Sequence, residues 1–330
     1  MAALALAGGC AQQETVGQNE AGKRFLEAWI SQNHPGAKLS GHGIYILSEE
    51  PGSGPLVSEA DRYVFIDYTV TDLEGNISAT TSEALAKQLG TYSPANVYGR
   101  YAIVNAQGQN PVGLLDIVDG MATGGSRKAL VPGWLNNKDI FGSAEEYYSQ
   151  SSGEDAIYTV RVLDKTADIN AFEVRQIESS PAAGMSGADS LEYGFYHKVL
   201  REGKGTDALP SDTTILLNYT ARRLDGQVFD TTVEDSAKVH GIYTASRTYD
   251  PVAVTMNQDL EQVKMKSGNS SDEGSGVVKG FALALSKMKP GEKCRVAFIS
   301  SQGYGARALG GLLLPPFSPL VFELELVSEE

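Results

Sequence analysis

The stretch TTILLNYTARRLDGQVF at residues 213–229 decides the fold, because RYVFIDYTVTDLEGNIS at 62–78 repeats its pattern. Each begins with the alternating apolar residues of a half-buried strand. Each then runs through Tyr-Thr to an acidic residue and a glycine, which indicate a hairpin turn. The matching tyrosines, Tyr68 and Tyr219, are 151 residues apart (219 − 68 = 151). We therefore predict two copies of one structural unit.

The repeat continues on both sides of these hairpins. VGLLDIVDGMATGGSRKALVPGWL at 112–135 matches VKGFALALSKMKPGEKCRVAFISSQGYG at 278–305, each an apolar helix, a glycine turn and a strand. AIYTVRVLD at 156–164 matches LVFELELVS at 320–328. An amphipathic helix and a strand precede each copy. Strands dominate this order, which predicts an α+β fold in which a curved antiparallel sheet wraps around a short helix.

The copies divide the chain into three predicted parts. Residues 1–22 form a leader and tether, residues 23–165 the first domain and residues 166–330 the second. A length of 330 residues with 42% hydrophobic content suits two globular domains. The net charge of −14 argues against nucleic acid as a partner, which requires a basic surface. No run approaches the ~18 apolar residues of a membrane span.

The start of the chain resembles a bacterial lipoprotein signal. ALALAGGC, residues 3–10, is apolar and ends at Cys10, and the polar run AQQETVGQNEAG follows. This predicts lipidation of Cys10 and a membrane anchor, with residues 11–22 as the tether. Two features depart from the pattern, because Ala7 stands where leucine is usual and a basic start is missing. An alanine-rich terminus without such a role is the alternative. The other cysteine, Cys294, is expected to be buried.

Three motifs of the second copy resemble the FKBP-type peptidyl-prolyl isomerases. They are YTARRLDGQVFD at 219–230, VVKGFALALSKMKPGEKCRVAFISSQGYG at 277–305 and LLLPPFSPLVFELELV at 312–327. The resemblance covers roughly residues 192–330, and the first copy, roughly 40–165, is recognisable mainly through the second. It implies two FKBP-like units, each a half-open antiparallel sheet around one helix, and an aromatic pocket between sheet and helix.

The resemblance also implies the site residues. The prolines of the last loop would hold two leucines over the pocket mouth. A phenylalanine stands at the pocket floor, where the family usually has tryptophan, and the segment 239–276 is longer than the family's link. The implied catalytic residues are Tyr219, Phe229, Asp230, Tyr304 and Phe322, and the implied substrate-binding residues are Val277, Val278, Phe281, Leu313 and Leu314.

Isomerisation of an X-Pro bond breaks no bond, so neither a nucleophile, a metal nor a cofactor is predicted. The barrier of ~18–20 kcal/mol arises from amide resonance. A twisted amide is less charge-separated than a planar one, and an apolar pocket favours it. Tyr304 is expected to donate a hydrogen bond to a substrate carbonyl, and Asp230 to organise the pocket. The histidines, His34, His42, His197 and His240, do not have metal-ligand spacing.

The first copy departs from this site. Tyr68 remains, but Ile77-Ser78 aligns with the Phe-Asp pair, Leu114 with the floor residue and Trp134 with Tyr304. Tyr158 stands where the last strand of the second copy carries Phe322. We therefore expect a fold without a working active site, used for binding or docking.

Two functions remain open from the sequence. The first is a lipid-anchored isomerase on the periplasmic face of the bacterial outer membrane. It would act on X-Pro segments of unfolded or exported polypeptides, with an outer-membrane protein complex as a further partner. The alternative is a non-catalytic periplasmic chaperone or an accessory subunit of an outer-membrane protein assembly.

Overall fold

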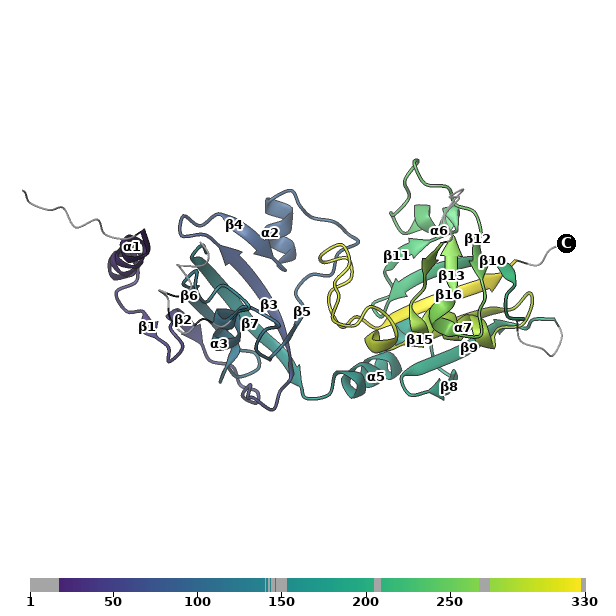
Figure 1. The fold of residues 1–330 in the computed structure, drawn as a ribbon, viewed down its shortest axis with the longest axis horizontal. Helices are drawn as coiled ribbons and strands as arrows, with labels where there is room; N and C mark the ends of the chain where they lie inside the picture. The colour runs from purple at the N-terminus through teal and green to yellow at the C-terminus, as the bar shows by residue number, and fades with distance from the viewer. Residues whose placement is uncertain are drawn as a thin grey trace, which may run out of the picture.

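The computed structural model describes residues 18–139, 141, 143, 146, 153–204, 209–266 and 274–327. These residues form two units joined end to end, each built on an antiparallel sheet (Figure 1). The predicted lipidation site, Cys10, lies outside the described residues. No helix in the described part of the chain is both long and apolar enough to cross a bilayer.

The first unit holds a 7-stranded sheet in the order β1-β2-β6-β7-β3-β4, with β5 paired to β3. One short helix, α3, packs against the face that carries the main apolar cluster of this unit. Its elements are α1 (Gln18–Asn33), β1 (Lys38–Leu39), β2 (Tyr45–Glu50), β3 (Tyr63–Thr71), β4 (Ile77–Thr80), α2 (Glu83–Gln88), β5 (Tyr101–Val104), α3 (Val112–Val118), β6 (Ser126–Val131) and β7 (Ala156–Thr166).

The second unit holds a 9-stranded sheet in the order β14-β13-β12-β10-β16-β15-β9-β8, with β11 paired to β10. Its elements are α5 (Ile169–Ser179), η1 (Pro181–Ala183), β8 (Asp189–Glu192), β9 (Phe195–Arg201), β10 (Thr214–Arg223), β11 (Val228–Thr231), α6 (Glu234–Val239), β12 (Val252–Thr255), η2 (Leu260–Gln262), β13 (Lys264–Lys266), β14 (Ser275–Gly276), α7 (Lys279–Lys287), β15 (Lys293–Phe298), η3 (Ser300–Gln302) and β16 (Leu320–Leu326).

The two sheets have the same topology. The path β8-β9-β15-β16-β10 of the second repeats β1-β2-β6-β7-β3 of the first, and β11 and β12 take the places of β4 and β5. The second unit adds the β13–β14 hairpin to the edge of its sheet. The predicted α+β fold with two similar antiparallel units is therefore confirmed.

Part of the segment 239–276, which the sequence indicated as a long insertion, belongs to the repeat. Tyr243 and Tyr249 stack with ring centroids 5.4 Å apart after α6. Tyr92 and Tyr98 stack at 5.6 Å after α2. Both pairs are related by the offset of the hairpin tyrosines (243 − 92 = 151 and 249 − 98 = 151). The addition in the second unit is thus the part that carries β13 and β14.

The helix α5 connects the units and packs on both. Ile177 lies in an apolar cluster with Ala297 and Val321 of the second sheet. At its other end, Ile169 and Phe172 pack with side chains of the first unit. The first sheet ends at Thr166, only three residues before α5 begins (169 − 166 = 3), so the helix is placed directly between the units.

Glu173 attaches α5 to the second unit through buried hydrogen bonds. Its carboxylate accepts the backbone N–H of Ser300 at 2.6 Å and the hydroxyl of Ser300 at 2.7 Å. Burial raises the pKa of Glu173 to about 7, and the two hydrogen bonds oppose that rise only in part. Folding therefore favours the protonated carboxyl.

This raised pKa predicts a pH-dependent stability. The contribution of protonated Glu173 is fully present below the unfolded pKa of 4.5 and is lost as the pH rises to about 7. We expect Glu173→Gln to remove this dependence, which is worth up to about 3 kcal/mol. Urea unfolding at pH 5 and pH 8 measures it. Glu178→Gln, at an exposed position of the same helix, is the control. Equal pH dependence in wild type and Glu173→Gln contradicts the assignment.

Candidate active site

Three aromatic side chains meet between the second sheet and α7. Tyr219 comes from β10, Phe322 from β16 and Phe281 from the first turn of α7. The Phe281 and Phe322 rings pack edge to face with centroids 5.3 Å apart, and Tyr219 lies 6.0 Å from Phe281 and 6.4 Å from Phe322. All three side chains are buried. These three side chains, which come from elements distant in sequence, form an aromatic cluster with a rigid apolar surface.

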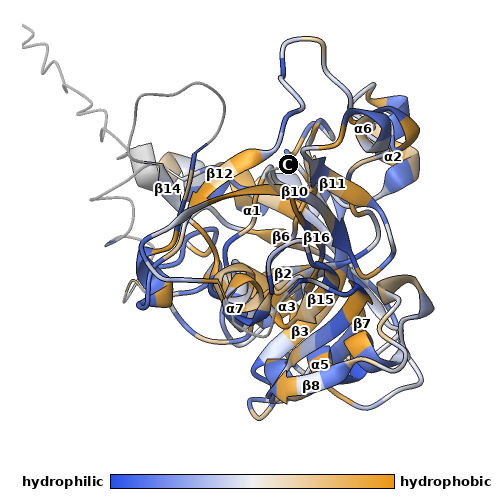
Figure 2. Ribbon diagram, turned by 90° about the vertical axis from the view of Figure 1, so that its right-hand side faces the viewer, coloured by the Kyte–Doolittle hydropathy of each residue, from blue (hydrophilic) through white to orange (hydrophobic). Residues whose placement is uncertain are grey.

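The position of Phe281 depends on a close contact between helix and sheet. A Cβ on Gly280 would lie 2.5 Å from the ring of Phe298 on β15. Real Cβ atoms essentially never approach another heavy atom this closely. The first unit repeats the contact, since a Cβ on Gly113 would lie 2.3 Å from Val131. Apolar residues, orange in Figure 2, run along α7. Glycine at the start of each helix lets that helix reach its sheet.

A polar chain of three residues borders the aromatic cluster. The Tyr219 hydroxyl donates to Oδ2 of Asp230 at 2.7 Å, and Arg247 donates to Oδ1 of the same carboxylate at 2.5 Å. Burial, and then the charge of Asp230, raise the pKa of the Tyr219 phenol far above its usual range. Tyr219 is therefore protonated and its hydroxyl points to the carboxylate. Both oxygens of Asp230 are therefore engaged, and its carboxylate joins Tyr219 to Arg247.

Sequence reasoning missed Arg247. It lies in the segment 239–276, which the sequence indicates is longer than the family's link. The signal was the repeat of the two stacked tyrosines at Tyr243 and Tyr249, because Arg247 lies between them and its guanidinium is 5.4 Å from the Tyr249 ring. A search for the hairpin offset beyond the first strands would have placed this segment beside the site.

The structure brings most of the predicted residues to the main apolar cluster of the second unit, which includes the three aromatic side chains. Tyr304 is half-buried there, and burial, followed by the charge of Asp230, raises its pKa. Leu313 is half-buried and is not part of this cluster, although its carbonyl accepts a hydrogen bond from Arg223 at 3.2 Å. The predicted residues that belong to or pack against the cluster are Tyr219, Phe229, Val277, Val278, Phe281, Tyr304, Leu314 and Phe322.

The proline-rich loop does not hold Leu314 over an open mouth. Leu314 is 2% exposed and is buried among the residues of the main apolar cluster. Its backbone forms an antiparallel bridge with Leu309. The loop therefore contributes to the core of the second unit as well as to its surface.

The other side of this loop packs on the first unit, as Figure 1 shows for the segment before β16. The ring of Phe317 meets Tyr63 of β3 edge to face at 5.0 Å. The carbonyl of Leu312 accepts the N–H of Val97 at 2.7 Å. Arg223 of β10 donates to the carbonyl of Ala95. The loop is thus shared by the two units.

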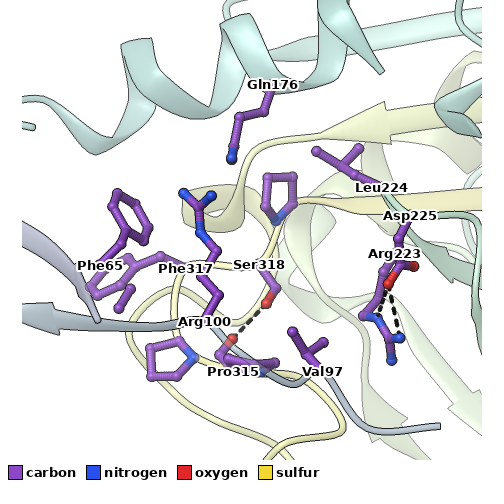
Figure 3. Close-up of a pocket in the computed structure, with 13 residues that line it drawn as sticks. Phe65, Val97, Arg100, Gln176, Arg223, Leu224, Asp225, Pro315, Phe317 and Ser318 are labelled. Carbon is purple, nitrogen blue, oxygen red and sulfur yellow. Dashed lines mark hydrogen bonds and ion pairs between the residues drawn. The ribbon is translucent and has the colours of Figure 1, made fainter. Parts of the chain in front are cut away.

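A small cavity lies at this junction (Figure 3). Its volume is about 160 Å³, and Pro315, Phe317 and Arg100 are among its lining residues. The Arg100 guanidinium stands 4.1 Å from the centroid of the Phe65 ring, and burial lowers its pKa. Phe317 has a φ of 57°, a left-handed conformation that costs a bulky residue about 1–2 kcal/mol. Such conformations persist where surrounding contacts impose them.

A family comparison identifies the second unit. Residues 205–327 match the model of the FKBP-type peptidyl-prolyl cis-trans isomerases. FK506-binding protein 1 of Eremothecium gossypii is 34% identical over 93 residues, which cover 80% of that protein and 26% of this chain. The chain belongs to the FKBP family. The matched region contains the aromatic cluster and its polar border, so the second unit is the FKBP domain.

Other relatives of the FKBP domain are matched over part of their length. The 22 kDa FKBP-type isomerase of Escherichia coli is 30% identical over 146 residues, 44% of this chain and 54% of that protein. The chain spans 24% of FK506-binding protein 59 of Drosophila melanogaster. The solved structure of FkpA from Escherichia coli aligns with a TM-score of 0.30 at 23% identity, over 48% of this chain and 62% of FkpA.

The first unit holds a larger cavity at the place that corresponds to the aromatic cluster of the FKBP domain. Its volume is about 590 Å³, and Tyr68, Tyr101, Leu114 and Tyr158 are among its lining residues. Tyr158 donates to Oδ1 of Asn136 at 2.7 Å. Burial raises the pKa of Tyr68 to about 12. Burial also raises the pKa of Tyr101 and of Tyr158, so the three phenols stay protonated and give this cavity hydrogen-bonding groups.

Strand register corrects one alignment between the units. Val70 pairs with Ala79, and Ala221 pairs with Asp230, with the same offset at both positions (221 − 70 = 151 and 230 − 79 = 151). Ala79, and not Ser78, therefore takes the place of Asp230. The first unit carries no carboxylate at this position beside Tyr68, which removes the acceptor that Tyr219 uses.

The helix contact predicts a sensitive glycine. We expect Gly280→Ala to lower the free energy of unfolding by about 1–3 kcal/mol, because the new methyl group forces α7 away from Phe298. Urea unfolding, monitored by tyrosine fluorescence, measures the change. Gly276→Ala is the matched control, because a Cβ there meets nothing within 4 Å. Equal stability of the two variants contradicts the close contact.

The shared loop predicts coupling between the units. We expect Phe317→Ala to lower the free energy of unfolding by about 1–2 kcal/mol, less than the 3–5 kcal/mol of a fully buried phenylalanine, because this ring is half-buried. In calorimetry, Phe317→Ala should show two unfolding transitions, and their midpoint temperatures should lie further apart than in wild type. Val239→Ala, at a side chain 81% exposed, is the control. An unchanged trace for Phe317→Ala excludes a stabilising interface.

Proposed function

We propose that the second unit is a peptidyl-prolyl cis-trans isomerase and that the first unit is not catalytic. The observation that carries this proposal is the buried cluster of Tyr219, Phe281 and Phe322 with Asp230 at its edge, inside the segment that matches the FKBP family. The first unit keeps the sheet and helix, but it has alanine where Asp230 stands.

The chemistry follows from an apolar wall beside fixed polar groups. Rotation about an X-Pro bond takes ~10–100 s without a catalyst. In the twisted state the amide loses resonance, so its carbonyl and nitrogen carry less charge and prefer an apolar surface. The rings of Tyr219, Phe281 and Phe322 supply that surface. A barrier lowered by ~5 kcal/mol corresponds to an acceleration of several thousand-fold.

The polar residues have separate roles in this proposal. Asp230 accepts from Tyr219 and Arg247 and holds both against the cluster. Tyr304 is half-buried beside this group, where its hydroxyl donates to the carbonyl that precedes the substrate proline.

Location and substrates belong to the same proposal. We propose that Cys10 is lipidated and anchors the chain to the periplasmic face of the bacterial outer membrane, where X-Pro segments of unfolded or exported polypeptides are the substrates. The polar run after Cys10 supports a tether, and an outer-membrane protein complex is the proposed further partner.

A specific observation also favours the non-catalytic alternative. The cavity of about 590 Å³ in the first unit is larger than a single side chain, and its lining includes apolar, hydroxyl, amide and charged groups. It suits an extended polypeptide held without isomerisation. A periplasmic chaperone or an accessory subunit of an outer-membrane assembly would use this cavity and leave the second site unused.

A protease-coupled isomerisation assay on an X-Pro tetrapeptide distinguishes the isomerase from the non-catalytic alternative. We expect the full chain to accelerate isomerisation and Asp230→Ala with Tyr304→Phe to lower kcat/KM by about 10- to 100-fold. That loss is about 1.4–2.7 kcal/mol, close to one hydrogen bond of about 1.5–3 kcal/mol that involves a charged group. Tyr68→Phe in the first unit is the matched control and should leave kcat/KM unchanged.

Two outcomes contradict the proposal. A folded wild-type chain without any acceleration excludes the isomerase and leaves the chaperone. A loss of activity in Tyr68→Phe equal to that of the double variant excludes the assignment of catalysis to the second unit.

A further inference from the structure

Three potential metal ligands converge in the second unit beyond the aromatic cluster. His197 lies on β9, Cys294 on β15, and Glu292 in the turn between α7 and β15. Their nitrogen, sulfur and carboxylate oxygen atoms all lie within 4.8 Å of one another. The residues are 7%, 0% and 2% exposed, respectively. The spacing of histidines in the sequence did not reveal this group, because β9 and β15 meet only through sheet pairing.

Two of these side chains have buried atoms without a hydrogen-bond partner. Nε2 of His197 and Oε1 of Glu292 face each other at 3.5 Å, and neither makes a hydrogen bond among the described residues. An unsatisfied buried nitrogen beside an unsatisfied carboxylate oxygen is unfavourable unless a third group lies between them.

We propose that His197, Glu292 and Cys294 bind a zinc ion. Imidazole nitrogen, carboxylate oxygen and thiolate sulfur are the ligand types that zinc takes in proteins, and three of them leave a fourth position for water. The charge of Zn²⁺ is balanced by one carboxylate and one thiolate, so a neutral complex is buried. On binding, zinc replaces the thiol proton of Cys294, which leaves to solvent as a Zn–S bond forms.

The surroundings already orient the carboxylate. The N–H of Lys289 donates to Oε2 of Glu292 at 3.1 Å, which leaves Oε1 directed toward His197. The carbonyl of Glu292 accepts the N–H of Leu326 at 3.0 Å, which fixes the turn to the end of β16. Such contacts around a ligand set its direction before a metal arrives.

Zinc at this place would join β9 to the turn that ends α7. Phe281 lies six residues before the last residue of this helix, Lys287 (287 − 281 = 6), a distance of about 9 Å along the axis. The ion would therefore stabilise the second unit without taking part in isomerisation, and this proposal does not depend on the proposed activity.

Cobalt(II) titration of the metal-free full chain tests the site, because a thiolate ligand produces a charge-transfer absorption band. We expect the band to saturate at one cobalt per chain and to disappear when zinc is added. Zinc should also raise the Tm, whereas magnesium should not. Cys294→Ser should abolish the band, and His197→Gln, which keeps the thiol, should weaken cobalt binding by about 10- to 100-fold or more. Cys10→Ser is the matched control and should keep the band.

Three results overturn the proposal. The first is a wild-type chain without a charge-transfer band and without a rise in Tm on adding zinc. The second is a band that is lost in Cys10→Ser and kept in Cys294→Ser. The third is a His197→Gln variant with wild-type affinity, and this variant decides the matter if Cys294→Ser does not fold.

Discussion

The antiparallel pairing of β10 with β16 is the constraint on which the second unit depends. It joins residues about a hundred positions apart, with Ala221 opposite Phe322 and Tyr219 opposite Leu324. Because alternate residues of a strand share a face, this register puts Tyr219 and Phe322 on the same side as diagonal neighbours. A shift of β16 by one residue against β10 would place Phe322 on the opposite face of the sheet from Tyr219 and remove the aromatic cluster.

The proline-rich loop before β16 has two structural roles. Leu314 enters the apolar cluster of the second unit, whereas Phe317 packs on Tyr63 of the first. Because the φ angles of the prolines around these residues are already restricted, the loop loses less conformational entropy on folding. The left-handed backbone of Phe317 is sustained by contacts on both sides. The surface that borders the candidate site is therefore also the contact between units.

The two units share the residues that hold helix and sheet together and differ at the candidate site. Both keep the glycine that brings the helix to the sheet and the tyrosine pair after the second hairpin strand. They differ in the few side chains that face the space between helix and sheet. Asp230 and Arg247 form an ion pair in the second unit, and Ala79 stands in place of Asp230 in the first. Changes at such positions alter the site without altering strand order.

Much of this architecture was determined by the sequence alone, because alternation of apolar residues, hairpin glycines and an internal repeat are local patterns. They predicted the α+β class and the two units, and the resemblance to the FKBP-type isomerases implied the aromatic residues Tyr219, Phe281 and Phe322. Tertiary structure decided what depends on pairing between distant strands. It placed Arg247 on Asp230, buried Leu314, turned Phe317 toward the first unit and brought His197 beside Cys294. The physical reason is that these contacts join side chains from different strands and loops, so they depend on how the elements pack and not on local spacing in the chain.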